Sequence, residues 1–208
     1  MLLVIGNKNY SSWSLRPWIA LKVFGFDFDE KSISLYGAQT KEAILKYSPA
    51  GKVPILVDGK TTVWDSLAIL EYLAERNRKL WPADAAERAL ARSLAAEMHS
   101  GFPSLRQHMS MNVRKRYPGK GRTPEVLAEI ERIKAIWNEA QKPFLFGTFT
   151  AADAMYAPVV LRFRTYEVEL PRAARSYNEA MLELPAMQEW IAAAERETES
   201  IPQLDTYG

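Results

Sequence analysis

Three serine hydroxyls stand close together near the start of the chain, at Ser11, Ser12 and Ser14. They follow the apolar run 2–5, which is typical of a strand, and they precede apolar residues at helical spacing. A helix N-terminus presents free N–H groups and positive partial charge, so hydroxyls placed there can help to hold an anion. The alternative is that the serines cap the helix, and the residues alone favour that interpretation.

A second helix start carries an acidic residue followed by serine, Asp65-Ser66. Ser66 could bind a carboxylate through its hydroxyl and backbone N–H, and Asp65 could pair with an ammonium group or simply act as the N-cap. Between the two helix starts, Lys52 precedes Val53-Pro54. Proline is the one residue whose cis peptide bond is readily accessible, although the residues alone favour an ordinary proline at the start of a strand.

Metal and nucleic-acid chemistry find little support in the sequence. The two histidines, His99 and His108, are nine residues apart, so they would face opposite sides of an ideal helix and should not share a metal. The basic stretch 114–122 could contact an anion, but no aromatic and basic pattern extends it, and we expect a solvated turn and no nucleic-acid partner. The absence of cysteine excludes disulfides, Cys-type zinc sites and a Cys nucleophile.

Length and composition place the chain among ordinary globular proteins. It has 208 residues, of which 48% are hydrophobic and 25% charged, enough for one large or two small domains. The net charge of +2 is too balanced to favour nucleic acid. No apolar run reaches the ~18 residues of a membrane helix, and the N-terminal run lacks the features of a signal peptide. We therefore expect a cytoplasmic protein with no membrane partner.

The chain changes character near residue 80. Before it, strand and helix patterns alternate as β-α-β-α-β-β-α, and we expect these elements over residues 2–5, 15–23, 27–35, 40–47, 53–57, 61–64 and 66–75. Asp58-Gly59 predicts a hairpin turn. After a linker over 77–82, only helical patterns follow, and we expect helices over residues 84–117, 123–141, 151–166, 171–182 and 185–199.

Two of the expected helices carry further signals. Thr150 and Asp153 fit a capping box at the start of the 151–166 helix, and Pro158 inside that helix should remove one backbone hydrogen bond. The expected 84–117 helix carries two neighbouring stripes, of which one should face the core and the other could face a cleft. The stripes are Met98, Leu105 and Met109, and His99, Phe102 and Arg106.

This layout and four short motifs together resemble the glutathione transferase superfamily. The motifs, in family order, are Ser11-Ser12-Trp13-Ser14-Leu15-Arg16, Lys52-Val53-Pro54-Ile55-Leu56, Asp65-Ser66, and Phe146-Gly147 with Ala152-Asp153-Ala154. The first is similar to the SSCxxR signature of the zeta class, the class of maleylacetoacetate isomerase, with Trp13 where that signature has Cys. The resemblance implies a thioredoxin-like α/β domain over 1–78 and an all-helical domain over 79–208 that contributes the electrophile pocket.

The resemblance implies an enzyme that conjugates the thiolate of glutathione, its co-substrate, to a small electrophile. It places the thiol contact on Ser11, with Ser12 as the second candidate and Tyr10 as a third. The implied glutathione-binding residues are Val53 through its backbone, cis Pro54, Asp65 and Ser66 for the γ-glutamyl end, and Lys52 or Lys41 for the glycine carboxylate. The implied electrophile pocket contains Tyr10, Trp13, His99, Phe102 and Arg106.

Two other functions fit the same resemblance. One is glutathione-dependent cis-trans isomerisation of the maleylacetoacetate type, against which Trp13 argues. The other is a non-catalytic relative that acts as a glutathione-binding module. Because the chain has no cysteine, it cannot form a mixed disulfide with glutathione, which disfavours thiol-disulfide exchange. The resemblance also implies a homodimer and detoxifying chemistry without a metal.

Overall fold

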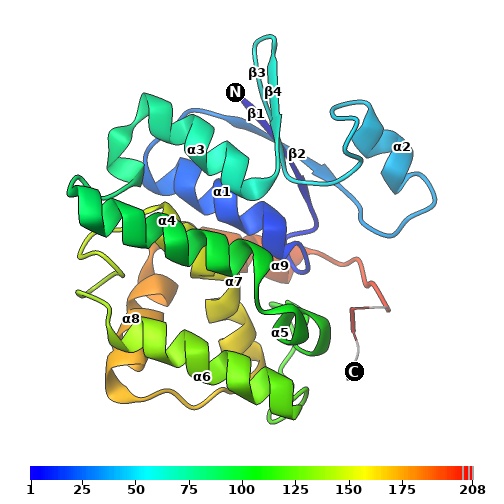
Figure 1. Cartoon of the computed structure of the whole chain (residues 1–208). Helices are drawn as coiled ribbons and strands as arrows, with labels where there is room; N and C mark the ends of the chain where they lie inside the picture. The colour runs from blue at the N-terminus through cyan, green and yellow to red at the C-terminus, as the bar shows by residue number, and fades with distance from the viewer. Residues whose placement is uncertain (203, 206, 208) are drawn as a thin grey trace.

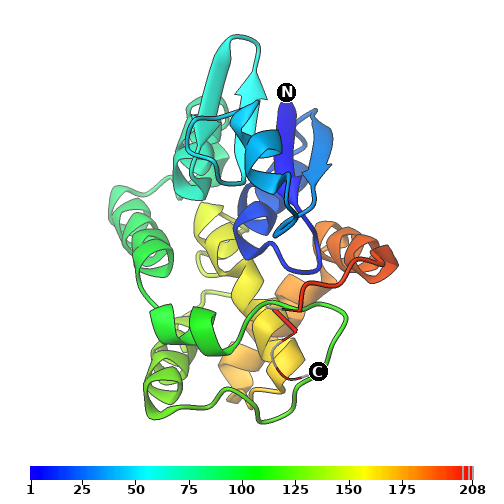
Figure 2. The same ribbon diagram turned by 90° about the vertical axis from the view of Figure 1, so that its right-hand side faces the viewer.

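A small mixed sheet with its helices forms the first part of the molecule, and a group of helices forms the second (Figures 1 and 2). The computed structural model describes residues 1–202, 204, 205 and 207. The element order βαβαββα is confirmed for the first part. Its elements are β1 (Leu2–Gly6), α1 (Ser12–Val23), β2 (Asp29–Ile33), α2 (Thr40–Leu45), β3 (Ile55–Asp58), β4 (Thr61–Trp64) and α3 (Ser66–Arg76).

The sheet has the strand order β2-β1-β3-β4. Strand β1 pairs parallel with β2 and antiparallel with β3, and β3 and β4 form the predicted hairpin. Successive side chains of a strand point to opposite faces. Leu3 and Ile5 accordingly join the core with α1 and α3, whereas Val4 packs with Ile44 of α2 on the other face. Helix α1 packs on the face of the sheet that carries Leu3 and Ile5, and it therefore lies between the sheet and the helical part (Figure 1).

The helical part differs from the prediction at its start. Its elements are the short 3₁₀ helix η1 (Arg78–Leu80), then α4 (Ala85–Ser100), α5 (Pro103–His108), α6 (Pro124–Asn138), α7 (Ala151–Tyr166), α8 (Arg172–Glu183) and α9 (Pro185–Arg196). The single helix expected over 84–117 is wrong. The break has a clear cause, because Pro103 has no N–H to donate and restricts the residue before it. That residue, Phe102, adopts a left-handed conformation with φ of 55°.

The break divides the two expected stripes between separate elements. Met98 lies on α4, Leu105 on α5 and Met109 just after it, yet all three are buried in the core, so this stripe does face inward. His99 and His108 lie on different helices. The chain after His108 has no helix until Pro124.

Helix α7 begins at the predicted capping box and is buried almost along its whole length. One carboxylate oxygen of Asp153 accepts the Thr150 N–H at 2.8 Å and the Thr150 hydroxyl at 2.9 Å, and the other accepts the Leu145 N–H at 3.0 Å. Every residue of α7 except Arg164 is buried, and the helix continues through Pro158. Asp153 therefore ties the preceding loop to the central helix.

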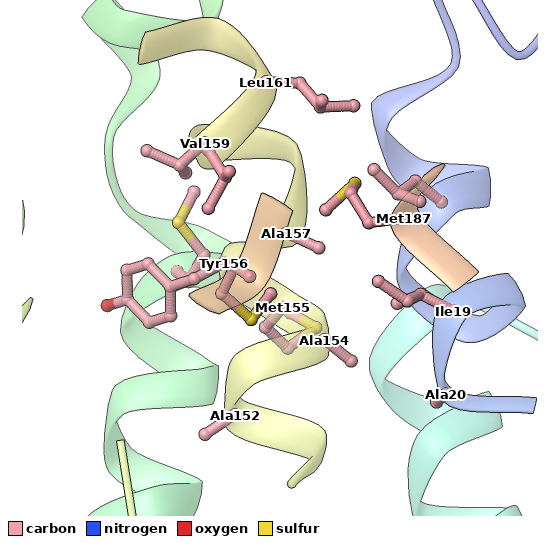
Figure 3. Close-up of a cluster of buried hydrophobic side chains, with 14 of the residues drawn as sticks. Ile19, Ala20, Ala152, Ala154, Met155, Tyr156, Ala157, Val159, Leu161 and Met187 are labelled. Carbon is pink, nitrogen blue, oxygen red and sulfur yellow. The ribbon is translucent and has the colours of Figure 1, made fainter. Parts of the chain in front are cut away.

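Small side chains let α7 approach its neighbours closely. Figure 3 shows Ala154 and Ala157 of α7 on the side that faces Ile19 of α1 and Met187 of α9. The distance between the axes of two packed helices depends on the side chains at their contact, so the small alanine side chains favour a short distance. All four residues are at most 1% exposed. This packing fixes the helical part against α1.

None of the helices in the described part of the chain combines the length and hydrophobicity that crossing a bilayer requires. Nor do three or more histidine or acidic side chains gather in a metal-binding group among the described residues.

The capping box generates a prediction for stability. Replacing Asp153 with Ala leaves the buried N–H groups of Leu145 and Thr150 without an acceptor. We expect the free energy of unfolding in urea to fall by about 3 kcal/mol. The control is Thr123→Ala, which removes only the cap of α6 (a 3.3 Å bond to the Val126 N–H) and should cost about 1 kcal/mol. Equal losses in the two variants would contradict the special role of Asp153.

Asp153 also predicts a pH dependence. Burial raises the pKa of its carboxyl from 3.8 to about 6. Between pH 3.8 and about pH 6, Asp153 is protonated in the folded protein but ionised in the unfolded chain. The stabilisation that comes from binding this proton is lost as the pH rises through the folded pKa. We expect the free energy of unfolding of the wild type to fall relative to that of Asp153→Asn between about pH 4 and about pH 7. A constant difference over this range would mean that burial does not raise this pKa.

Candidate active site

One cleft of about 1010 Å³ lies between the sheet and the helical part. Twelve of the thirteen predicted site residues line it, namely Tyr10, Ser11, Ser12, Trp13, Lys41, Lys52, Val53, Pro54, Asp65, Ser66, His99 and Arg106. The exception is Phe102, which does not line the cleft. Its left-handed backbone before Pro103 turns the side chain into the hydrophobic core, where it is 6% exposed.

The serine loop, residues 7–14 between β1 and the first turn of α1, carries three hydroxyls, of which those of Ser11 and Ser12 line this cleft, whereas Ser14 is fully buried. Ser11 is the N-cap residue of α1, but its side chain makes no capping hydrogen bond to the backbone of the helix. Its Oγ lies 2.7 Å from the Ser14 Oγ, and the Ser14 Oγ accepts the Gly6 N–H at 3.1 Å. Ser14 is therefore the serine that ties the loop to β1.

Ser12 has a different partner, contributed by the helical part. Its Oγ accepts a hydrogen bond of 3.1 Å from Arg162 of α7, which also donates to the Met109 carbonyl. Burial lowers the pKa of Arg162 to about 10, so the guanidinium remains protonated at neutral pH. Sequence reasoning missed Arg162. The available signal was an arginine within the long apolar stretch of a helix expected to be central.

The start of α3 forms the opposite side of the cleft. Asp65 caps α3 through the Leu67 N–H at 2.8 Å, and its other oxygen lies 3.3 Å from His99 Nε2. Its φ of 75° is rare for a residue other than glycine and is typical of positions constrained for function. Ser66 is fully buried, and its hydroxyl accepts a 3.3 Å hydrogen bond from Arg16.

The remaining predicted ligands lie along one edge of the cleft. Pro54 follows a cis peptide bond, and the half-buried Val53 lies two residues before Ile55, the first paired residue of β3. Lys41 and Lys52 are exposed. Their ammonium groups are therefore free to reach a ligand or remain in solvent.

Positive charge gathers around Trp13. The Arg16 guanidinium stacks 4.1 Å from the centre of the Trp13 ring and that of Arg106 lies 5.7 Å from it. The pKa of Arg16 falls to about 9 through burial and through its repulsion by Arg106 and Arg162. None of these three guanidiniums forms an ion pair with a carboxylate of the described residues. The cleft is therefore suited to an anion.

The C-terminal segment holds the loop that carries the serines. The Glu197 carboxylate accepts the N–H groups of Lys8 at 2.6 Å and Asn9 at 2.9 Å. The Tyr10 hydroxyl donates a 3.0 Å hydrogen bond to the Asp205 carboxylate and accepts one of 3.2 Å from the Ile201 N–H. Its one hydrogen is therefore already used. The lining residues that sequence reasoning missed include Arg162, Leu204, Ser110, Met111, Tyr36 and Trp64.

Comparisons with known proteins agree on both halves of the chain. The family model described as the glutathione S-transferase N-terminal domain matches residues 10–76, and the C-terminal domain model matches residues 83–193. The chain is 30% identical to the maleylacetoacetate isomerase of Rattus norvegicus in an alignment of 193 positions that covers 87% of each protein. It is 29% identical to a zeta-class glutathione S-transferase of Euphorbia esula in an alignment of 192 positions that covers 86% of this chain and 84% of that one.

Solved structures show the same fold. A glutathione transferase homologue from Burkholderia, solved with bound glutathione, matches with a TM-score of 0.73 at 24% identity and covers 94% of this chain and 98% of its own. A bacterial zeta-class maleyl pyruvate isomerase matches with a TM-score of 0.73 at 23% identity, over 96% and 100% of the two chains. With both of its halves matched by models of one family, the chain belongs to the glutathione transferase family.

Proposed function

We propose that this protein is a serine-type glutathione transferase that joins the sulfur of glutathione to a small, negatively charged electrophile. The observation that carries the proposal is the convergence of three elements on one cleft. These are the serine loop at the start of α1, the segment that carries Val53 before β3, and the start of α3 at Asp65 and Ser66.

Each part of glutathione has a partner of matching chemistry in this cleft. The γ-glutamyl carboxylate binds at Ser66 and the α3 N-terminus, and its ammonium group binds Asp65. The backbone of Val53 pairs with the cysteinyl backbone as a short added strand. Lys41 or Lys52 receives the glycine carboxylate. The cysteinyl sulfur then reaches Ser11 and Ser12 at the N-terminus of α1.

The site promotes the reaction by keeping the sulfur ionised. A free thiol of this kind has a pKa near ~8.5, and the thiolate is the nucleophile. A hydroxyl donor and the positive end of α1 both favour the anion. The thiolate forms a C–S bond to the electrophilic carbon. In a substitution, the displaced electron pair departs with the leaving group. When the thiolate adds to a carbon–carbon double bond, the electron pair moves to the neighbouring carbon, which then takes a proton.

The charge of the cleft supports an anionic electrophile. Arg106 is half-buried beside Trp13, and burial lowers its pKa, so the cation is held where water solvates it poorly. Glu129 acts on Arg106 from a distance but forms no ion pair with it among the described residues, so a carboxylate on the electrophile could pair with Arg106 directly, and the Trp13 ring would cover the apolar part of the electrophile.

Glutathione-dependent isomerisation is the second candidate, because the same arginines suit an unsaturated dicarboxylate. The relatives named maleylacetoacetate isomerase support it, while Trp13 in place of the zeta-class Cys argues against it. The two reactions differ in stoichiometry. Conjugation consumes one glutathione for each product, whereas isomerisation returns it.

The proposal is tested by retention on immobilised glutathione together with turnover of electrophiles. Retention with consumption of glutathione supports a transferase, retention with turnover but no consumption supports an isomerase, and retention without turnover supports a binding module. Failure of the wild type to bind glutathione at millimolar concentration, measured by calorimetry, would overturn the proposal.

Ser66 yields a prediction for binding. Ser66→Ala removes a fully buried hydroxyl at the start of α3, and losing its hydrogen bond to a carboxylate should raise the Kd for glutathione about tenfold. Calorimetry measures this. The control is Ser93→Ala on the exposed face of α4, where the hydroxyl donates only to the Ala89 carbonyl, and its Kd should equal that of the wild type. An unchanged Kd for Ser66→Ala would place the γ-glutamyl end elsewhere.

Arg106 yields a prediction for specificity. Arg106→Gln should lower kcat/KM for an electrophilic carboxylic acid at least about tenfold more than for its neutral methyl ester, because only the acid loses a counter-charge. Arg132→Gln is the matched control, since Arg132 pairs with Glu97 on the surface of α6. Equal losses for acid and ester would show that Arg106 does not recognise charge.

A further inference from the structure

Arg162 is a buried cation without a counter-charge. It is 5% exposed, and its two partners are the Met109 carbonyl and the Ser12 hydroxyl. No carboxylate of the described residues pairs with it. Burying an unpaired charge is unfavourable by several kcal/mol, so an anion that arrives beside it is strongly favoured. Arg162 and Ser12 both line the cleft, which is where such an anion can bind.

The hydrogen-bond inventory distinguishes the two candidate serines. A hydroxyl has one hydrogen to donate and two lone pairs to accept. The Ser12 oxygen accepts from Arg162, so its own hydrogen has no partner among the described residues, and the neighbouring charge polarises it. Ser11 shares a 2.7 Å hydrogen bond with Ser14, whose oxygen already accepts the Gly6 N–H. One hydrogen of the Ser11–Ser14 pair lies in their shared bond, so Ser11 can donate to a ligand only when Ser14 supplies that hydrogen, whereas the Ser12 hydrogen has no partner among the described residues in either case.

We propose that Ser12 is the hydroxyl that donates to the sulfur of glutathione, and that Arg162 is the positioning residue that makes Ser12 a strong donor. This inference rests on the proposed function. The thiol gives its proton to water, and the sulfur keeps the electron pair as a thiolate that accepts the Ser12 O–H. The helical part thereby contributes a charge to a reaction centre built on α1.

The test is a pH titration of the thiolate absorbance of bound glutathione, with no electrophile present. Ser12→Ala and Arg162→Gln should each raise the pKa of the bound thiol by about one pH unit, which means about tenfold less thiolate at a fixed pH below it. Ser12→Thr should restore the wild-type value because it keeps the hydroxyl. Arg162→Lys should shift the pKa less than Arg162→Gln because it keeps the charge.

The double variant Ser12→Ala/Arg162→Gln shows whether Arg162 acts through Ser12. We expect the pKa shift of the double variant to be no larger than that of either single variant, since both changes disable the same donor, the Ser12 hydroxyl polarised by Arg162. Additive shifts would overturn this part of the inference. A larger shift in Ser11→Ala than in Ser12→Ala would overturn the choice of Ser12.

S-methylglutathione separates a role in ionisation from a role in structure, because its thioether cannot ionise. Its Kd should change little in Ser12→Ala and Arg162→Gln, whereas the Kd for glutathione above its thiol pKa should rise about tenfold. Equal losses for both ligands would assign these residues a structural role. If Arg162→Gln does not fold, Ser12→Ala against Ser12→Thr decides the outcome. A wild type that binds no glutathione overturns the proposed function as well, whereas binding with an unchanged pKa in Ser12→Ala overturns this inference alone.

Discussion

The contact between α7 and α1 is the constraint on which the rest of the site depends. Alanines on α7 allow it to approach α1 closely, and the buried Asp153 capping box fixes where α7 begins. Because α1 carries the serine loop at its N-terminus, this packing sets the distance between that loop and the helical part. It also brings Arg162, two turns along α7 from Ala154, to the Ser12 hydroxyl.

The cleft that results holds more positive than negative charge near its centre. Arg16, Arg106 and Arg162 influence one another, and the described residues provide Asp65 as the acidic group that raises the pKa of Arg16. In the free protein this excess charge is unfavourable. Glutathione brings carboxylates and, once ionised, a thiolate, so binding and ionisation become coupled through the same cations. The absence of cysteine fits this chemistry, because the reactive sulfur arrives with the co-substrate.

Much of the sheet domain, and the start of α7 in the helical part, could be predicted because their signals are local. Strand alternation, the Asp58-Gly59 turn and the Thr150–Asp153 capping box each involve residues close in the chain. The single helix expected over 84–117 is wrong because the local pattern stays helical on both sides of Pro103, and the break before Pro103 leaves Phe102 in the core. Arg162 could not be assigned to the site from spacing, since its partner Ser12 is 150 residues away and meets it only through tertiary packing.

A crystal structure with bound glutathione tests the central claim most directly. The account predicts the γ-glutamyl carboxylate at Ser66, the cysteinyl backbone paired with Val53, and the sulfur within hydrogen-bonding distance of the Ser12 hydroxyl at the N-terminus of α1. A glutathione whose sulfur points away from the serine loop, or whose γ-glutamyl end lies outside the start of α3, would contradict it.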